Sequence, residues 1–152
     1  MSEDNESVPE APEQPDETEP EAAPKNPLGR IEWLDLTVHD GRRLRDFYSE
    51  VVGWKAADVD MGMYSDYNMN LPESGETIAG ICHARGQNAS LPSQWLVYVR
   101  VASVHEAAET CRQKGGEVLD GPKRMGSSDI CVIKDPAGAV MALLSDRKPK
   151  AT

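Results

Sequence analysis

Residues 31–54, IEWLDLTVHDGRRLRDFYSEVVGW, contain the first strand and helix signals of the chain. Ile31–Val38 has the alternation of a half-buried strand. Asp40 carries the side chain of a helix N-cap, and Gly53 suits the position just after a helix C-terminus. Between them, apolar residues recur at i, i+3, i+4, i+7 and i+8, which predicts one buried helix face made of Leu44, Phe47, Tyr48, Val51 and Val52.

A second copy of this strand and helix occupies the C-terminal half. Residues 94–101 predict a strand, and Ser103 and Glu106 form a capping box at the start of the following helix. Superposing Asp40 on Ser103 also superposes Gly53 on Gly116, because thirteen residues separate the members of each pair. The chain therefore contains an internal repeat.

Each predicted helix is followed by three short strand-like stretches, at 54–59, 63–70 and 77–83 in the first half and at 117–119, 129–134 and 139–144 in the second. Each half is thus βαβββ. We predict an α+β fold in which two such modules form a partly open eight-stranded barrel around a pocket. The predicted domain spans 28–147, with module one at 28–84, a linker at 84–93, module two at 94–147 and a short tail at 148–152.

The N-terminal segment differs from the rest of the chain in composition. Residues 1–27 hold nine acidic side chains, one base and six prolines, and they carry −8 of the formal charge of −10. Such a segment has too few apolar side chains to offset the entropy of ordering, so we predict a disordered acidic tail. It acts as a solubilising extension or as an acidic arm that docks on a partner.

Several classes of protein lack support in this sequence. No secretory leader or bilayer-spanning apolar run is present, so we expect a cytoplasmic protein without membrane association. Cys82, Cys111 and Cys131 have no framework spacing, which favours reduced thiols. No basic stripe is interleaved with aromatic residues, so a nucleic-acid partner is not expected.

Two motifs resemble one known family. The first is Asp-Gly-Arg-Arg-Leu-Arg-Asp-Phe-Tyr-Ser-Glu-Val-Val-Gly-Trp at 40–54, and the second combines Lys-Gly-Gly-Glu-Val-Leu-Asp-Gly-Pro at 114–122 with Asp-Pro-Ala-Gly-Ala-Val at 135–140. Together they resemble the vicinal-oxygen-chelate superfamily, which includes glyoxalases, bleomycin-resistance proteins and extradiol dioxygenases. The resemblance spans roughly 28–146 and is strongest to uncharacterised members related to lactoylglutathione lyase. It implies a homodimer.

The resemblance also implies a metal site, whose ligands come from the first and last strands of each module. Those positions map to Trp33, Gly80, Leu96 and Ala142, and none of these side chains is a metal ligand. A shift of one residue offers Glu32 and Met141 at best, whereas a shift of two recovers Asp35, Cys82 and Tyr98. We therefore expect no metal cofactor unless the register differs from this alignment.

The same strand faces predict a ligand pocket, lined by Trp33, Asp35, Leu96, Tyr98, Arg100 and Ala142. Asp35 and His83 are the candidate catalytic residues, with Asp35 as a general base if burial raises its pKa. Each residue also has a structural interpretation. Trp33 and Tyr98 fill space where relatives hold a metal, and Asp35 forms an ion pair with Arg100.

Three functions are compatible with this pocket. The first is a metal-free protein that binds a small organic molecule, similar to the antibiotic-sequestering members of the family. The second is an enzyme, a lyase or isomerase of the lactoylglutathione-lyase type or a dioxygenase-like member, which works without the usual metal. It needs another positive charge to stabilise an enolate, and Arg100 is the candidate. The third is a dimeric scaffold with a vestigial pocket.

Overall fold

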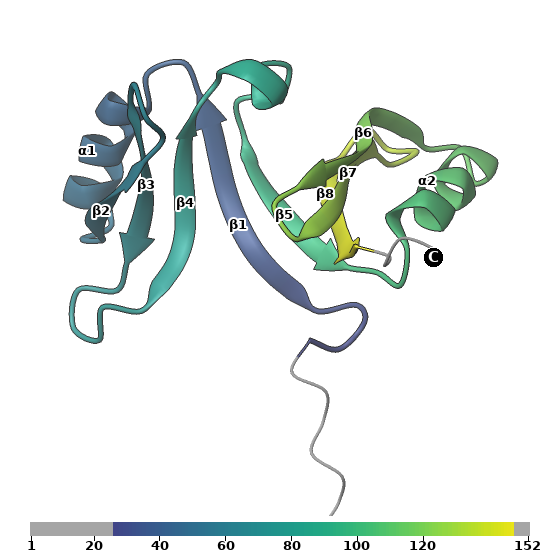
Figure 1. Cartoon of the computed structure of the whole chain (residues 1–152), viewed down its shortest axis with the longest axis horizontal. Coiled ribbons are helices and arrows are strands. Elements are labelled where there is room, and N and C mark those ends of the chain that lie inside the picture. Colours follow the sequence, from purple (N-terminus) through teal and green to yellow (C-terminus); the bar gives the residue numbers. More distant parts are fainter. Residues whose placement is uncertain (1–25, 148–152) are drawn as a thin grey trace, which may run out of the picture.

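The computed structural model of the chain describes residues 26–147, which form eight strands and two α-helices (Figure 1). The predicted acidic tail lies almost entirely outside this range, as do residues 148–152. The first module contains β1 (Ile31–Val38), α1 (Gly41–Val51), β2 (Lys55–Asp60), β3 (Ser65–Asn70) and β4 (Thr77–His83). The second contains β5 (Trp95–Arg100), α2 (Val104–Gln113), β6 (Glu117–Met125), β7 (Ser128–Lys134) and β8 (Val140–Asp146). The predicted α+β class with two βαβββ modules is confirmed.

The eight strands form one mixed sheet in the order β2-β3-β4-β1-β5-β8-β7-β6. The two modules meet where β1 pairs with β5 in antiparallel orientation, while β1 pairs with β4, and β5 with β8, in parallel. Leu34 and Val97 occupy equivalent positions of the two repeats and lie directly opposite each other. The modules therefore pair edge to edge within one chain, a point that the sequence left open. Since β2 and β6 are the two ends of the sheet order, the barrel is partly open, as predicted.

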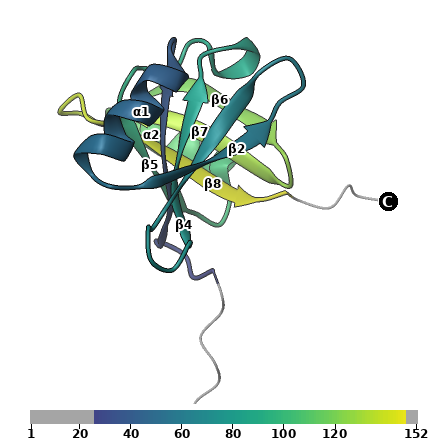
Figure 2. The ribbon, with the colours of Figure 1, turned by 90° about the vertical axis from the view of Figure 1, so that its left-hand side faces the viewer.

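Both helices pack on one face of the sheet, which we call the outer face. Figure 1 places α1 and α2 at opposite ends of the molecule, and Figure 2 shows α1 lying across the first module. A cluster under α1 contains Leu36, Tyr67, Met69, Ala79 and Ile81. Between α2 and the sheet, Val104 and Ala108 of the helix pack against Cys131 and Leu143. The opposite face, which we call the inner face, has its own core of Leu91, Leu96, Tyr98, Ile130, Val132, Ala142 and Leu144.

The helix caps agree with the sequence, but the buried face of α1 is narrower than predicted. The side chain of Asp40 accepts from the Arg43 N–H, and that of Ser103 accepts from the Glu106 N–H. Of the five predicted core residues of α1, Leu44 and Tyr48 pack against the sheet cluster. The other three, Phe47, Val51 and Val52, are at least half exposed, because only one side of the helix packs on the sheet.

Two segments differ from the sequence prediction. Strand β6 extends to Met125, six residues beyond the predicted end at Leu119, with register shifts on either side of Asp120. The expected linker contains a short 3-10 helix, Gly86–Asn88. Within residues 26–147, no helix is both long and apolar enough to cross a bilayer.

Candidate functional site

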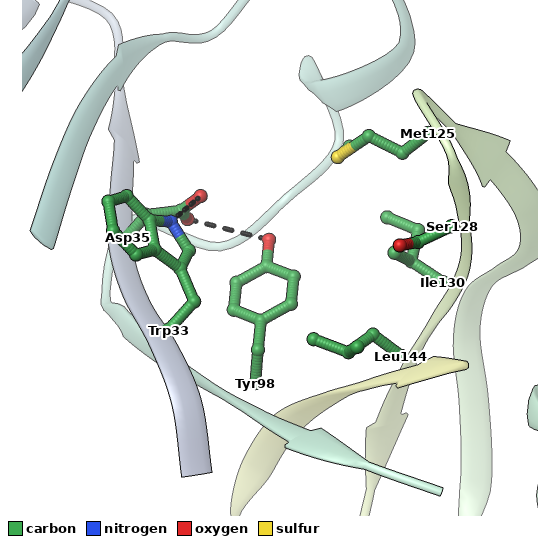
Figure 3. A pocket seen from close by; sticks show the side chains of 7 residues that line it. All are labelled: Trp33, Asp35, Tyr98, Met125, Ser128, Ile130 and Leu144. Carbon is green, nitrogen blue, oxygen red and sulfur yellow. Dashed lines mark hydrogen bonds between the residues drawn. The ribbon is translucent and has the colours of Figure 1, made fainter. Parts of the chain in front are cut away.

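A cavity of about 200 Å³ opens on the inner face at the junction of the two modules. One wall comes from the central strands and holds Trp33, Asp35 and Tyr98 (Figure 3). The facing wall comes from the second module and holds Met125, Ser128, Ile130 and Leu144. The cavity therefore has an aromatic and acidic side opposite a mainly apolar side.

A second lobe of about 200 Å³ adjoins the first. The two lobes share Asp35, Tyr98 and Met125, which makes them parts of one hollow. The remaining lining residues of the second lobe mix polar and apolar side chains and are Thr37, Met61, Asp66, Cys82, Asn88 and Leu91. Met61 and Met125 are about half exposed, which places flexible side chains at the rim.

Strand register explains why the key side chains meet. Trp33 lies directly opposite Tyr98 on β5, and Asp35 lies opposite Leu96. Residues opposite each other in a ladder point to the same side of the sheet, and alternate residues along a strand share a face. Trp33, Asp35 and Tyr98 therefore project together from the inner face.

Asp35 is the polar centre of the cavity. Its Oδ2 accepts a hydrogen bond from Trp33 Nε1 at 3.3 Å, and its Oδ1 accepts one from the Tyr98 hydroxyl at 3.5 Å. Burial raises the pKa of Asp35 from its ordinary 3.8 to about 6, although the two hydrogen bonds oppose the shift; the nearby Asp66 carboxylate adds to it. A carboxyl group with this pKa exchanges a proton close to neutral pH.

Two neighbours of Asp35, Tyr98 and Cys82, stay neutral at physiological pH. Burial, and then the charge of Asp35, raise the pKa values of both Tyr98 and Cys82 above their ordinary values. Tyr98 is therefore a hydroxyl donor, and Cys82 is a thiol rather than a reactive thiolate. Asp66 is buried, and its Oδ1 accepts from the His83 backbone N–H at 2.9 Å.

The four positions that map to the family's metal ligands do not fit a metal ion. The indole of Trp33 lies on Gly80, so that a Cβ added at Gly80 would be 3.0 Å from Trp33 Cζ2. Leu96 and Ala142 lie on the same face but are fully buried in the core beneath the cavity. Carbon and an indole N–H thus occupy the four positions that the resemblance assigns to metal ligands.

The shifted ligand set does share one lobe, since Asp35, Cys82 and Tyr98 all line it. Burial raises the pKa of the thiol and of the phenol, so a metal ion would have to displace a firmly held proton from each of these two groups. Over residues 26–147, no group of three or more His, Cys, Asp or Glu side chains is arranged to hold a metal ion.

Arg100 does not form the expected ion pair with Asp35. Its Nε and Nη2 donate to both carboxylate oxygens of Glu32, and its Nη1 donates to Asp146 at 2.8 Å. The cause is a register shift between Ile31 and Trp33, which acts as a β-bulge and brings Glu32 beside Arg100. Arg100 does not line either lobe, so the expectation that it contacts a ligand has no support in this geometry.

His83 lies apart from Asp35. It follows Cys82 on β4 and therefore points to the outer face, where its Nδ1 is 3.3 Å from the Gly41 N–H at the start of α1. The ring lies against Gly41, since a Cβ there would be 3.0 Å from His83 Nε2. The two candidate catalytic residues are thus on opposite faces of the sheet.

Several lining residues were not among the sequence candidates, namely Met125, Ser128, Ile130 and Asp66. Ile130 has a recognisable signal, because Ser128, Ile130 and Val132 alternate along one strand that pairs with β8. Met125 has none, since the Asp120-Gly121-Pro122 stretch indicates a turn rather than a strand.

A family model described as the glyoxalase/bleomycin resistance protein/dioxygenase superfamily matches residues 30–143. Among curated proteins, the chain is 25% identical over 131 residues to the anthracycline biosynthesis protein DnrV of Streptomyces peucetius and 24% identical to DauV of Streptomyces sp. (strain C5). Each alignment covers 76% of this chain and 46% of the relative, so the chain spans about half the length of these relatives.

Solved structures of similar fold share little sequence with the chain. A protein described as an NAD-dependent benzaldehyde dehydrogenase from Legionella pneumophila has a TM-score of 0.50 at 13% identity, covering 76% of this chain and 98% of that chain. A variant of Streptomyces coelicolor methylmalonyl-CoA epimerase, in complex with 2-nitronate-propionyl-CoA, has a TM-score of 0.49 at 19% identity, covering 83% and 100%. At these identities the likeness concerns the fold alone.

Replacing Asp35 by Asn should make the free energy of unfolding less dependent on pH. The pKa of Asp35 is higher in the folded protein, so its stabilising effect is complete below pH 3.8 and is lost as pH rises through about 6. From pH 4 to pH 8, Asp35→Asn should gain roughly 2 kcal/mol of unfolding free energy relative to the unsubstituted protein. Urea denaturation at each pH measures this gain, and Asp58→Asn, at an exposed carboxylate on β2, is the control. A constant difference across pH would contradict the burial of Asp35.

Trp33 and Gly80 should be energetically coupled. Gly80→Ala places a methyl group against the indole and should cost about 1–3 kcal/mol of unfolding free energy. In a protein that already carries Trp33→Leu, the same change should cost much less, because the clash is gone. Thermal or urea unfolding of the two single variants and the double variant gives the coupling energy, and additive effects would show that the indole does not lie on Gly80.

Proposed function

The chain belongs to the glyoxalase/bleomycin resistance protein/dioxygenase superfamily, and on this basis we propose that its inner-face cavity binds a small organic molecule without a metal ion. The observation that carries the proposal is an indole lying on a glycine, at two positions that the resemblance assigns to metal ligands, beside a carboxylate at the cavity wall. An apolar hollow with a few polar anchors is the usual composition of a small-molecule site.

The shape of the lining supports a planar ligand. Trp33 and Tyr98 stand on one wall, and the aliphatic side chains of Ile130 and Leu144 face them across the cavity. A flat ring system binds favourably between such walls, because it buries apolar area and makes aromatic contacts. The two curated relatives named as anthracycline biosynthesis proteins also favour a ligand built of fused rings.

An enzyme of the lyase or isomerase type is the second candidate, and the raised pKa of Asp35 favours it, because a general base works best near neutral pH. Such a reaction also needs positive charge near the developing oxyanion. Arg100 is held by Glu32 and Asp146, and His83 lies on the outer face. The geometry therefore supports binding better than enolate chemistry.

The scaffold hypothesis has less support, because side chains do not fill the hollow. A homodimer stays part of the proposal, as the family resemblance implies it.

The proposal predicts saturable binding of a neutral planar probe, 2-naphthalenemethanol, in the cavity. In ¹H–¹⁵N NMR spectra, the backbone amide signals of Trp33, Tyr98 and Ile130 and the indole N–H signal of Trp33 should shift on titration. Trp33→Ala should weaken binding about 3- to 10-fold, the range expected for loss of one aromatic contact. Trp54→Phe, on the outer face, is the matched control and should leave the affinity unchanged. Absence of saturable shifts at the inner face, or equal losses in both variants, would contradict the proposal.

A further inference from the structure

The ionisable carboxylic acids Asp35 and Asp66 line the cavity. We infer that the site selects a planar ligand carrying a protonated amine, with the ammonium group placed at the Asp35 carboxylate between Trp33 and Tyr98. The inference rests on the proposed function, since it presumes that the cavity binds a small molecule, and it adds the charge class of that molecule.

The first support is the composition of the two lobes. Among the described residues that line them, Asp35 and Asp66 are the ionisable carboxylic acids, and neither lobe is lined by Lys or Arg. A carboxylate or phosphate group entering this hollow would meet carboxylates in a partly dehydrated site, where like charges repel more strongly than in water. The lining therefore disfavours anionic ligands.

The second support is that the cations on the inner face are already paired. Arg100 is held by Glu32 and Asp146, as described above. Lys123 lies opposite Ile130 in the β6–β7 ladder, and its Nζ is 2.6 Å from an Asp120 oxygen. Among residues 26–147, no cation is a cause of the Asp35 pKa, so a bound cation is the simplest source of positive charge for this carboxylate.

The third support is the geometry around Asp35 itself. Its two hydrogen bonds, at 3.3 and 3.5 Å, are longer than usual for their donor types and therefore weak, and each carboxylate oxygen has a further lone pair, so both keep accepting capacity. An ammonium group donates up to three hydrogen bonds and would offset the cost of burying the carboxylate. The flanking aromatic rings add attraction wherever the cation reaches a ring face.

The test compares three probes that share one ring system and differ in charge: 2-naphthylmethylamine, 2-naphthalenemethanol and 2-naphthoate. Affinities are measured at pH 7.5 by NMR titration or calorimetry on the full chain. The amine should bind at least about 10-fold more tightly than the alcohol, in line with a hydrogen bond to a charged group, and the naphthoate should bind most weakly.

Asp35→Asn should bring the affinity for the amine down to that for the alcohol and leave the alcohol nearly unchanged. Asp58→Asn removes the same charge from an exposed site and should preserve the preference. Asp66→Asn should reduce the preference only in part, because Asp66 lies in the adjoining lobe.

The preference should also weaken below pH 6, as Asp35 takes up a proton. The other titratable or charged groups near it are Asp66 on β3, Cys82 on β4, Tyr98 on β5, and the paired Asp120 and Lys123 on β6. The raised pKa values of Cys82 and Tyr98 keep both neutral in this range. A pH effect that survives in Asp35→Asn would assign it to another group and count against the inference.

The outcomes separate this inference from the function on which it rests. If the three probes bind equally well, the cavity binds small molecules but the charge preference is wrong. Tightest binding of the naphthoate would overturn the preference outright. If no probe binds at the inner face, the proposed function fails, and the inference fails with it.

Discussion

The antiparallel pairing of β1 with β5 is the contact on which the site depends. It joins two modules that each have one helix and one uncovered sheet face, and it turns those faces toward a common hollow. The register of that pairing puts Trp33 opposite Tyr98 and Asp35 opposite Leu96, on the inner side. A slip of one residue would exchange this set for Glu32, Leu34 and Val97, and the hollow would lose its aromatic wall and its carboxylate.

The chemistry of the hollow is determined by the side chains at those inner positions of β1 and β5. The indole of Trp33 packs on Gly80, which has no side chain, and the indole N–H donates a hydrogen bond to Asp35. A position that the family resemblance assigns to a metal ligand is thus filled by a flat apolar group with a buried acid at its edge. Asp35 is buried, and burial of its charged form is unfavourable. The raised pKa of Asp35 reflects this unfavourable free energy. Proteins tolerate such destabilised groups where function uses them.

Periodicity and caps were sufficient to predict the repeat, the fold class and the inner positions of Trp33, Asp35 and Tyr98, because strand alternation is a local property. Three features of the structure were not predicted from the sequence. The bulge at Glu32 gives Arg100 a different partner, the parity of β4 sends His83 to the outer face, and the long β6 brings Met125 over the cavity. A register shift decided the first outcome and an unexpected strand length decided the third, and neither has a strong signal in a single sequence.

The central claim is that a carboxylate lies buried against an indole in the hollow between the modules. The Trp33 Nε1–H signal in ¹H–¹⁵N NMR spectra tests it most directly, because this proton is donated to Asp35. As pH is varied, the account predicts a titration of that signal with a midpoint of about 6, absent from Asp35→Asn, while the indole signals of Trp54 and Trp95 stay constant. A midpoint near the ordinary 3.8 of an exposed aspartate, or no response of Trp33 to Asp35, would contradict it.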